Sequence, residues 1–170
     1  MEDMPLYMLL IALVVLLILS AFFSLSETSM MAINRYRLKY LAKEGHRGAR
    51  LTTQLLLNTD RLLGVILLGN NLLNAAAATL VAVIISNFFA HNELALLIGT
   101  VCVTFAILVF SEITPKVIAA AYPERIALAS SYVLTPLLKL FYPVVWFVNL
   151  FVQALLIILH LKPNEDNTTQ

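Results

Sequence analysis

Residues 5–31 read PLYMLLIALVVLLILSAFFSLSETSMM, and this stretch decides the fold. Its single charged side chain is Glu27, near the end of the run. A helix needs about 20 apolar residues to cross the hydrocarbon core of a bilayer, and this run is longer. The residues before it, MEDM, are acidic, whereas a signal peptide begins with a positive segment. We therefore expect a retained membrane-spanning helix.

The composition of the whole chain agrees with this expectation. Hydrophobic residues make up 61% of the 170 residues and charged residues 12%. A soluble domain is about half apolar and about a quarter charged. The single cysteine, Cys102, excludes a disulfide framework and a multi-cysteine zinc site. We expect an all-α membrane protein whose surroundings are the lipid bilayer, with no nucleic-acid partner.

Two further runs, 62–88 and 94–122, also have the length of a span. A fourth apolar stretch, 126–161, is interrupted by a lysine and by Pro136 and Pro143, each of which removes a helical hydrogen bond. As a fourth span it would put the C-terminus outside, and as a proline-bent belt at the inner interface it would leave the C-terminus in the cytosol. We favour the belt, which gives three transmembrane helices.

A basic segment, 34–61, separates the first two spans and holds seven of the eleven Lys and Arg residues. This bias places the segment in the cytoplasm. We therefore predict a multi-pass protein of the inner or plasma membrane, with its N-terminus outside and its C-terminus cytoplasmic. Apolar residues at helical spacing within 34–58 indicate juxtamembrane helices in the interface, although a plain basic loop is an alternative. The predicted transmembrane domain covers 1–161, and 162–170 is a polar tail or linker.

Each predicted span carries polar residues inside its apolar run. They are Ser20 and Ser24 in the first span, Gly69, Asn70, Asn71 and Asn74 in the second, and Ser111, Glu112, Pro115 and Lys116 in the third. Counted from the cytoplasmic ends at 1.5 Å per residue, Ser24, Asn70 and Glu112 all lie about 10–15 Å deep. Polar groups in hydrocarbon face a cavity or a partner. We therefore expect these groups to form one site.

The residue types indicate which ligand this site takes. Pro115 has no N–H for the carbonyl of Ser111, and a carbonyl freed beside Glu112 must find water, a side chain or a cation. Hydroxyls, amides, a carbonyl and one carboxylate form an all-oxygen set that suits Mg²⁺, and Na⁺ would also fit. The predicted metal ligands are Ser20, Ser24, Asn70, Ser111 and Glu112, with Gly69, Asn71, Asn74, Pro115 and Lys116 as possible additional lining.

Simpler roles are open for each group. The serines can let helices approach closely, and the asparagines can join helices by hydrogen bonds. Glu112 and Lys116, four residues apart, can neutralise each other. An intramembrane hydrolase needs a nucleophile with a base or two opposed aspartates. The predicted spans contain no aspartate, so we expect no enzyme.

Three motifs together resemble the CNNM/CorC family of magnesium transport proteins, and especially its bacterial CorB/CorC branch. They are SAFFSLSET at 20–28, LLGNNLLN at 67–74 and SEITPK at 111–116. With flanking segments the resemblance covers almost the whole chain in the family's order and spacing. Leu25 and Ser111 stand where family members often have glycine, which can stiffen the first motif and crowd the third.

The resemblance implies a homodimer with a belt-like helix and cytosolic CBS and CorC-type domains in the full-length protein. It also implies an inward-facing acidic cavity that binds dehydrated Mg²⁺ and exports it in exchange for Na⁺. By the resemblance the ion site falls on Ser20, Ser24, Asn70, Ser111 and Glu112, with Pro115 and Lys116 at its mouth. The alternative function is a non-conducting membrane anchor that senses Mg²⁺ for cytosolic domains.

Overall fold

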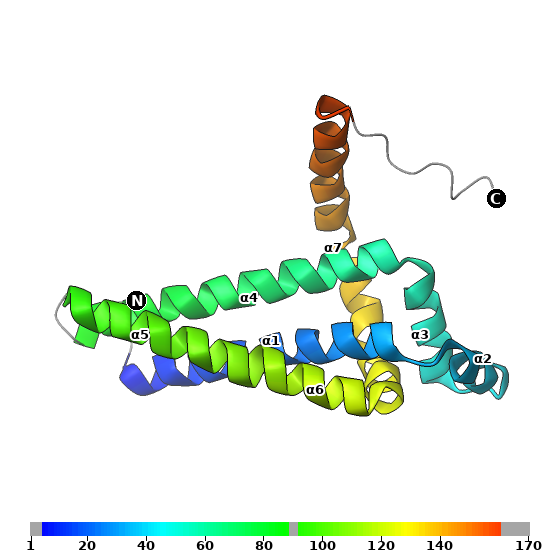
Figure 1. Ribbon diagram of the computed structural model, residues 1–170, viewed down its shortest axis with the longest axis horizontal. Coiled ribbons are helices and arrows are strands. Elements are labelled where there is room, and N and C mark those ends of the chain that lie inside the picture. Colours follow the sequence, from blue (N-terminus) through cyan, green and yellow to red (C-terminus); the bar gives the residue numbers. More distant parts are fainter. Residues whose placement is uncertain (1–4, 89–91, 161–170) are drawn as a thin grey trace.

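The computed structural model describes residues 5–88 and 92–160, which form helices and no strand. Three long helical rods lie side by side in a bundle (Figure 1). They are α1 (Leu6–Ala32), α4 (Thr59–Phe88) and a third rod made of α5 (Glu93–Ala106), η1 (Ile107–Ile113) and α6 (Thr114–Ala121). The rods occupy the three runs predicted as spans. The tail predicted at 162–170 lies outside the described residues.

The third rod changes its helical form in the middle, because η1 is a π-helix. The N–H of Thr114 donates to the carbonyl of Val109, five residues earlier. Pro115 follows directly and has no N–H, so it cannot serve the carbonyls of Phe110 or Ser111. The interruption expected at Pro115 is therefore present, but as a π-helix before the proline. Single π-helical turns of this kind are frequent at functional sites.

Two short helices, α2 (Arg35–Lys43) and α3 (Arg47–Leu57), occupy the predicted juxtamembrane segment. The Asn34 side chain caps α2 by accepting a hydrogen bond from the Tyr36 N–H at 2.9 Å. His46 caps α3 through its Nδ1. The two helices pack on each other and α3 packs on α7, which closes one end of the bundle. We call this end, which carries α2, α3 and the start of α7, the basic end.

The segment predicted as a belt is one helix, α7 (Pro123–Ile158), which continues through Pro136 and Pro143. It crosses the bundle at the basic end, and its later half leads away from the three rods (Figure 1). By length and apolar composition, four helices in the described ranges are able to cross a membrane: α1, α4, the third rod and α7. The predicted all-α class is confirmed.

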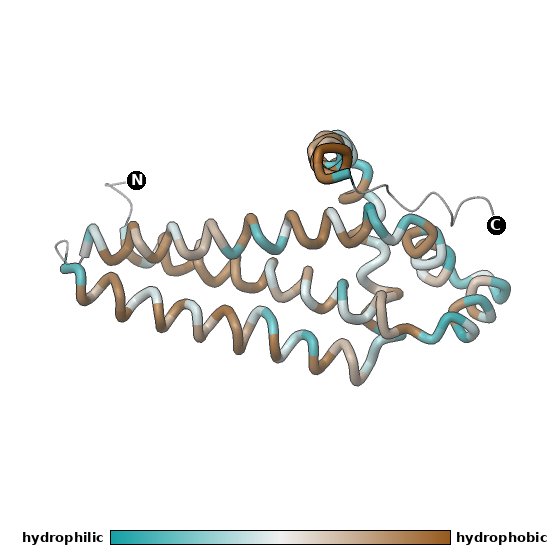
Figure 2. Tube along the Cα trace, turned by 45° about the horizontal axis from the view of Figure 1, so that its top comes forward, coloured by the Kyte–Doolittle hydropathy of each residue, from teal (hydrophilic) through white to brown (hydrophobic). Residues whose placement is uncertain are grey.

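The tightly packed apolar core lies at the basic end, where α1, α3, α4 and α7 meet. Its members include Met30, Leu38, Leu55, Leu62, Ile66, Ala127 and Leu134. Further along the rods, large apolar side chains such as Ile11, Ile18 and Phe105 are exposed. Figure 2 shows hydrophobic colour along most of the rods and hydrophilic colour gathered at α2 and α3. Exposed apolar rods beside a polar end suit a protein surrounded by lipid.

Candidate functional site

A polar cluster joins the three rods inside the bundle. The hydroxyl of Ser20 on α1 lies 2.5 Å from Oδ1 of Asn70 and 2.9 Å from Oδ1 of Asn74, and can donate to either. The amide nitrogens of both asparagines donate to Oε1 of Glu112, at 3.3 and 3.4 Å. We call these four residues the polar cluster. Asn70 and Glu112 therefore meet as their depths suggested, but Ser20, rather than Ser24, is the serine that joins them.

Local structure explains why these side chains meet. Asn70 and Asn74 are four residues apart and so share one face of α4. A Cβ on Gly69 would lie 2.8 Å from the ring of Phe23, so a larger residue would force the ring to move or the helices apart, and glycine allows this close approach of α1 to α4. That approach brings Ser20 within reach of the asparagines. Gly69 thus acts through packing and is not itself a ligand side chain.

Ser24 lies one helical turn from Ser20, toward the basic end. Its side chain is completely buried. Among the buried side-chain nitrogen and oxygen atoms of the described residues, its hydroxyl oxygen is the one without a hydrogen-bond partner. A buried polar group left unpaired costs about 1–3 kcal/mol. An unpaired hydroxyl beside the polar cluster is an oxygen available to a ligand.

Ser111 and Asn71, like Ser24, do not join the cluster through their side chains. The hydroxyl of Ser111 donates to the carbonyl of Leu17 at 3.0 Å and so ties η1 to α1. Asn71 is exposed and lines an apolar pocket of about 220 Å³ with Val145 and Val148 of α7. Adjacent residues on a helix point about 100° apart, so Asn71 cannot follow Asn70 into the cluster. Asn74, predicted only as additional lining, is a full member.

The proposed neutralisation of Glu112 by Lys116 is wrong. Lys116 is exposed, and within residues 5–88 and 92–160 the one ion pair is between Arg37 and Glu124. The carboxylate of Glu112 is met instead by the two asparagine amides. Pro115 is buried just beyond η1. Two amides of α4, rather than a local pair within the third rod, therefore stabilise this carboxylate.

Most of the atoms in the cluster that could bind a metal ion are neutral oxygens. In the described part of the chain, no three His, Cys, Asp or Glu residues are grouped so that they could hold a metal ion. A site for soft metals such as zinc needs such a group. Hydroxyl and amide oxygens around one carboxylate instead suit a hard cation.

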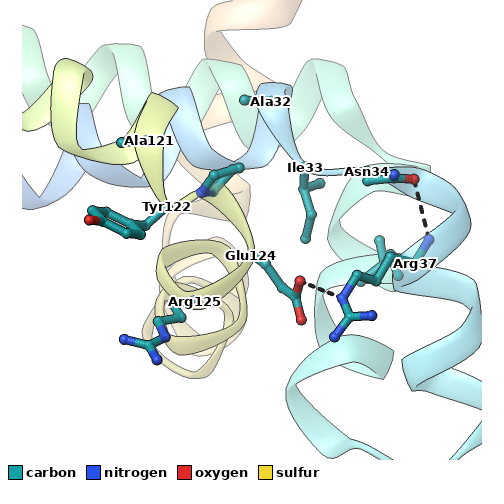
Figure 3. A pocket seen from close by; sticks show the side chains of 10 residues that line it. Ala32, Ile33, Asn34, Arg37, Ala121, Tyr122, Glu124 and Arg125 are labelled. Carbon is teal, nitrogen blue, oxygen red and sulfur yellow. Dashed lines mark hydrogen bonds and ion pairs between the residues drawn. The ribbon is translucent and has the colours of Figure 1, made fainter.

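A pocket of about 480 Å³ lies away from the cluster, at the basic end (Figure 3). It opens between the end of α1, α2 and the junction of α6 with α7. Inside it, Nε of Arg37 donates to Oε2 of Glu124 at 2.6 Å, which joins α2 to α7 (Figure 3). Nothing in the sequence signalled this contact, because its partners are 87 residues apart.

Comparisons with known proteins agree with the motifs. The family model described as "Cyclin M transmembrane N-terminal domain" matches residues 11–170. A UPF0053 protein of Haemophilus influenzae is 44% identical over 95% of this chain, and the UPF0053 inner membrane protein YfjD of Escherichia coli is 42% identical over 85% of it. A "Polyamine export protein" of Haemophilus influenzae is 29% identical over 85%.

The chain spans only 38%, 33% and 36% of the length of these three relatives. The region matched by the family model includes all members of the polar cluster and Ser24. Several long apolar helices and an inner-membrane relative indicate a multi-pass membrane protein. The chain therefore belongs to the CNNM/CorC family, whose cyclin M transmembrane domain it matches over almost its entire length.

Proposed function

We propose that this chain is the membrane domain of a magnesium transporter that exports Mg²⁺ in exchange for Na⁺. The observation that carries the proposal is the polar cluster, in which three helices bring hydroxyl, amide and carboxylate oxygens together. These are the ligand types that Mg²⁺ prefers. The transporter acts as a homodimer in the bilayer, and CBS and CorC-type cytosolic domains accompany the membrane domain in the full-length protein.

The two asparagines give the site a way to accept and release charge. A lone carboxylate in hydrocarbon is costly. With the amide hydrogens toward Glu112, two hydrogen bonds stabilise the carboxylate in the absence of a cation. A half-turn of each amide about its last torsion would instead present Oδ1, and Mg²⁺ would then balance the carboxylate. Asn70 and Asn74 thus serve as donors or as ligands according to occupancy.

Other oxygens complete the proposed site. Ser20 lies within reach of both asparagines, and Ser24 offers a buried hydroxyl with no protein partner. Ser111 contributes through its carbonyl, which has lost Pro115 as a donor. A single carboxylate, Glu112, binds a dehydrated cation less tightly than several would, and a transport site needs such release.

The position of α7 supports three spans and a belt. Tyr142 and Asn149, two turns apart on α7, each line a pocket together with Arg61. Arg61 is the last charged residue before the apolar run of α4, which marks the level of the headgroups. These contacts support a belt in which α7 crosses the start of α4 at the inner interface, an arrangement that has the N-terminus outside and the C-terminus cytoplasmic.

Cysteine labelling tests this topology. A cysteine placed at the C-terminus of a Cys102→Ser variant, in spheroplasts, should react with an impermeant maleimide only after the membrane is opened. Cys102 must be replaced because it is exposed. Labelling of intact spheroplasts would place the C-terminus outside and make α7 a fourth span.

A second candidate is the export of organic polycations. One relative is named a polyamine export protein, and amide, hydroxyl and carboxylate oxygens can accept hydrogen bonds from ammonium groups. A polyamine carries its charges along an extended chain, whereas the cluster offers one carboxylate, Glu112. The compact cluster therefore favours a small inorganic cation.

Flux from proteoliposomes tests the proposed function. The wild-type protein should move Mg²⁺ only when an opposing Na⁺ gradient is present, and Glu112→Gln should fall to the level of empty liposomes. The matched control is Glu44→Gln, which neutralises an exposed carboxylate at the end of α2. Spermidine flux that exceeds Mg²⁺ flux would support the polycation candidate. Mg²⁺ binding without flux would indicate the non-conducting sensor.

A further inference from the structure

A second polar concavity lies at the basic end, between α3, the start of α4 and the middle of α7. It is a pocket of about 400 Å³ with two leucines in its wall. Its polar lining consists of Gln54, Asn58, Arg61, Thr135, Lys139 and Tyr142. We propose that this pocket, called the headgroup pocket below, binds the phosphate of an anionic phospholipid of the inner leaflet.

The charge of the headgroup pocket favours an anion. Arg61 and Lys139 both line it, and no carboxylate does. Asp60 lines the adjoining pocket and forms no ion pair with Arg61 among the described residues. The remaining polar groups are amides and hydroxyls, all of which can donate hydrogen bonds. The pocket therefore presents two positive charges that the protein itself does not neutralise.

Arg61 is held in a position that suits phosphate. The carbon of its guanidinium group lies 4.4 Å from the ring centre of Tyr142, and its Nη2 donates to the tyrosine hydroxyl at 3.3 Å. Arginine has five N–H donors in a planar fork that matches phosphate. Because Tyr142 engages one of these donors, four remain for a ligand.

The surroundings distinguish a lipid from free phosphate. Arg61 immediately precedes the apolar run of α4, and Lys139 lies among apolar residues in the middle of α7. Leu55 and Leu138 form an apolar wall beside these charges. A phospholipid has a phosphate next to apolar acyl chains and can contact both the charges and the leucines. Inorganic phosphate has no apolar part to contact the leucines. Arginine, lysine and tyrosine are also the usual residues at headgroup level.

Native mass spectrometry of the full chain in detergent, titrated with phosphatidylglycerol or phosphatidylcholine, tests the proposal. Wild-type protein should retain phosphatidylglycerol preferentially. A basic residue near anionic lipid contributes enough that Arg61→Gln or Lys139→Gln should each weaken binding about fivefold, and the double variant about 25-fold. The matched control is Lys43→Gln with Arg47→Gln, which removes two exposed charges from the same end but outside the pocket.

Each other result contradicts the proposal. Equal retention of phosphatidylglycerol and phosphatidylcholine would show that the pocket does not select an anionic headgroup. An equal loss in the control would show a general effect of charge rather than a site. Full displacement by inorganic phosphate would identify a free anion instead. Arg61→Lys keeps the charge but not the planar fork, so it should weaken phosphatidylglycerol binding less than Arg61→Gln does. It also provides a variant that retains the charge should Arg61→Gln fold poorly, and phosphatidylglycerol binding equal to that of Arg61→Gln would contradict the proposal.

Discussion

Two polar groups in the molecule are paired differently. Thr52 of α3 and Ser131 of α7 are both completely buried, whereas the polar cluster between the three rods has two buried members, Ser20 and Asn70, and two half-buried ones, Asn74 and Glu112. The hydroxyls of Thr52 and Ser131 hydrogen-bond to each other, and they also reach the carbonyls of Gly48 and Ala127, each at 2.8 Å. We call this group the α3–α7 clasp. It carries no charge, and both of its hydroxyls have partners.

The polar cluster instead contains a carboxylate, and its neighbour Ser24 has no partner. Buried polar groups that serve only the fold are almost always fully paired, and each exception needs an explanation. The α3–α7 clasp fits the first description, and the cluster with Ser24 fits the second. The comparison predicts that changes at the clasp alter stability, whereas changes at the cluster alter cation handling.

Among the uncharged polar residues, the largest expected effect is at Asn70. Asn70→Leu keeps the size of the side chain but removes the groups that contact Ser20 and Glu112. Loss of an oriented ligand or its support costs about 10- to 100-fold in metal affinity, so Mg²⁺ flux should fall by that much. Ser131→Ala in the clasp is the control, with flux per folded protein unchanged. Equal loss of flux in both variants would erase the distinction between the two groups.

The second effect is at Thr52. Thr52→Val removes a hydroxyl bonded to Ser131 and to the carbonyl of Gly48, with little change in shape. The Ser131 hydroxyl keeps its bond to the carbonyl of Ala127, so loss of the shared hydrogen bond should lower the free energy of unfolding by about 0.5–1.5 kcal/mol. Thermal unfolding in detergent, followed by circular dichroism, measures the change. An unchanged Tm would show that the clasp contributes nothing to stability.

The third effect separates stability from binding at one residue. Ser24→Ala removes a buried hydroxyl that has no partner, so stability should stay the same or rise by up to about 1 kcal/mol. Mg²⁺ affinity should nevertheless fall several-fold. Unfolding and binding are measured on the same preparation. A fall in stability with normal affinity would make Ser24 a structural residue.

The smallest effect is at the ion pair between Arg37 and Glu124, whose side chains are 57% and 37% exposed. An exposed pair contributes about 0.2–1 kcal/mol and is screened by salt. Arg37→Gln should therefore lower the Tm slightly at low salt, and the difference should vanish in high salt. A large, salt-independent loss would assign this contact a role comparable with that of the clasp.

Depth along the helices was enough to predict that the polar side chains meet. A polar group in hydrocarbon faces a cavity or a partner, so Ser24, Asn70 and Glu112 at similar depths predicted one cluster. Asn70 and Glu112 do meet, but Ser20, one turn from Ser24, is the serine that joins them. Rotation about each helix was harder to predict. Asn71 points away from the cluster, although it follows Asn70 directly.

The π-helix and the clasp lay beyond sequence reasoning. Pro115 signals a break, but no apolar period reveals a five-residue hydrogen-bond ring before it, so the direction of the Ser111 hydroxyl toward Leu17 was missed. Thr52 and Ser131 are 79 residues apart. Nothing local to either residue indicates its partner, because their contact depends on how α3 and α7 pack.

The measurement that tests the central claim most directly is equilibrium Mg²⁺ binding, by titration calorimetry of the protein in nanodiscs. Wild-type protein should bind Mg²⁺ saturably, and Glu112→Gln should bind it about 100-fold more weakly while unfolding at the same temperature. Thr52→Val should bind Mg²⁺ like the wild type. Unchanged affinity in Glu112→Gln would contradict the assignment of the polar cluster as the cation site.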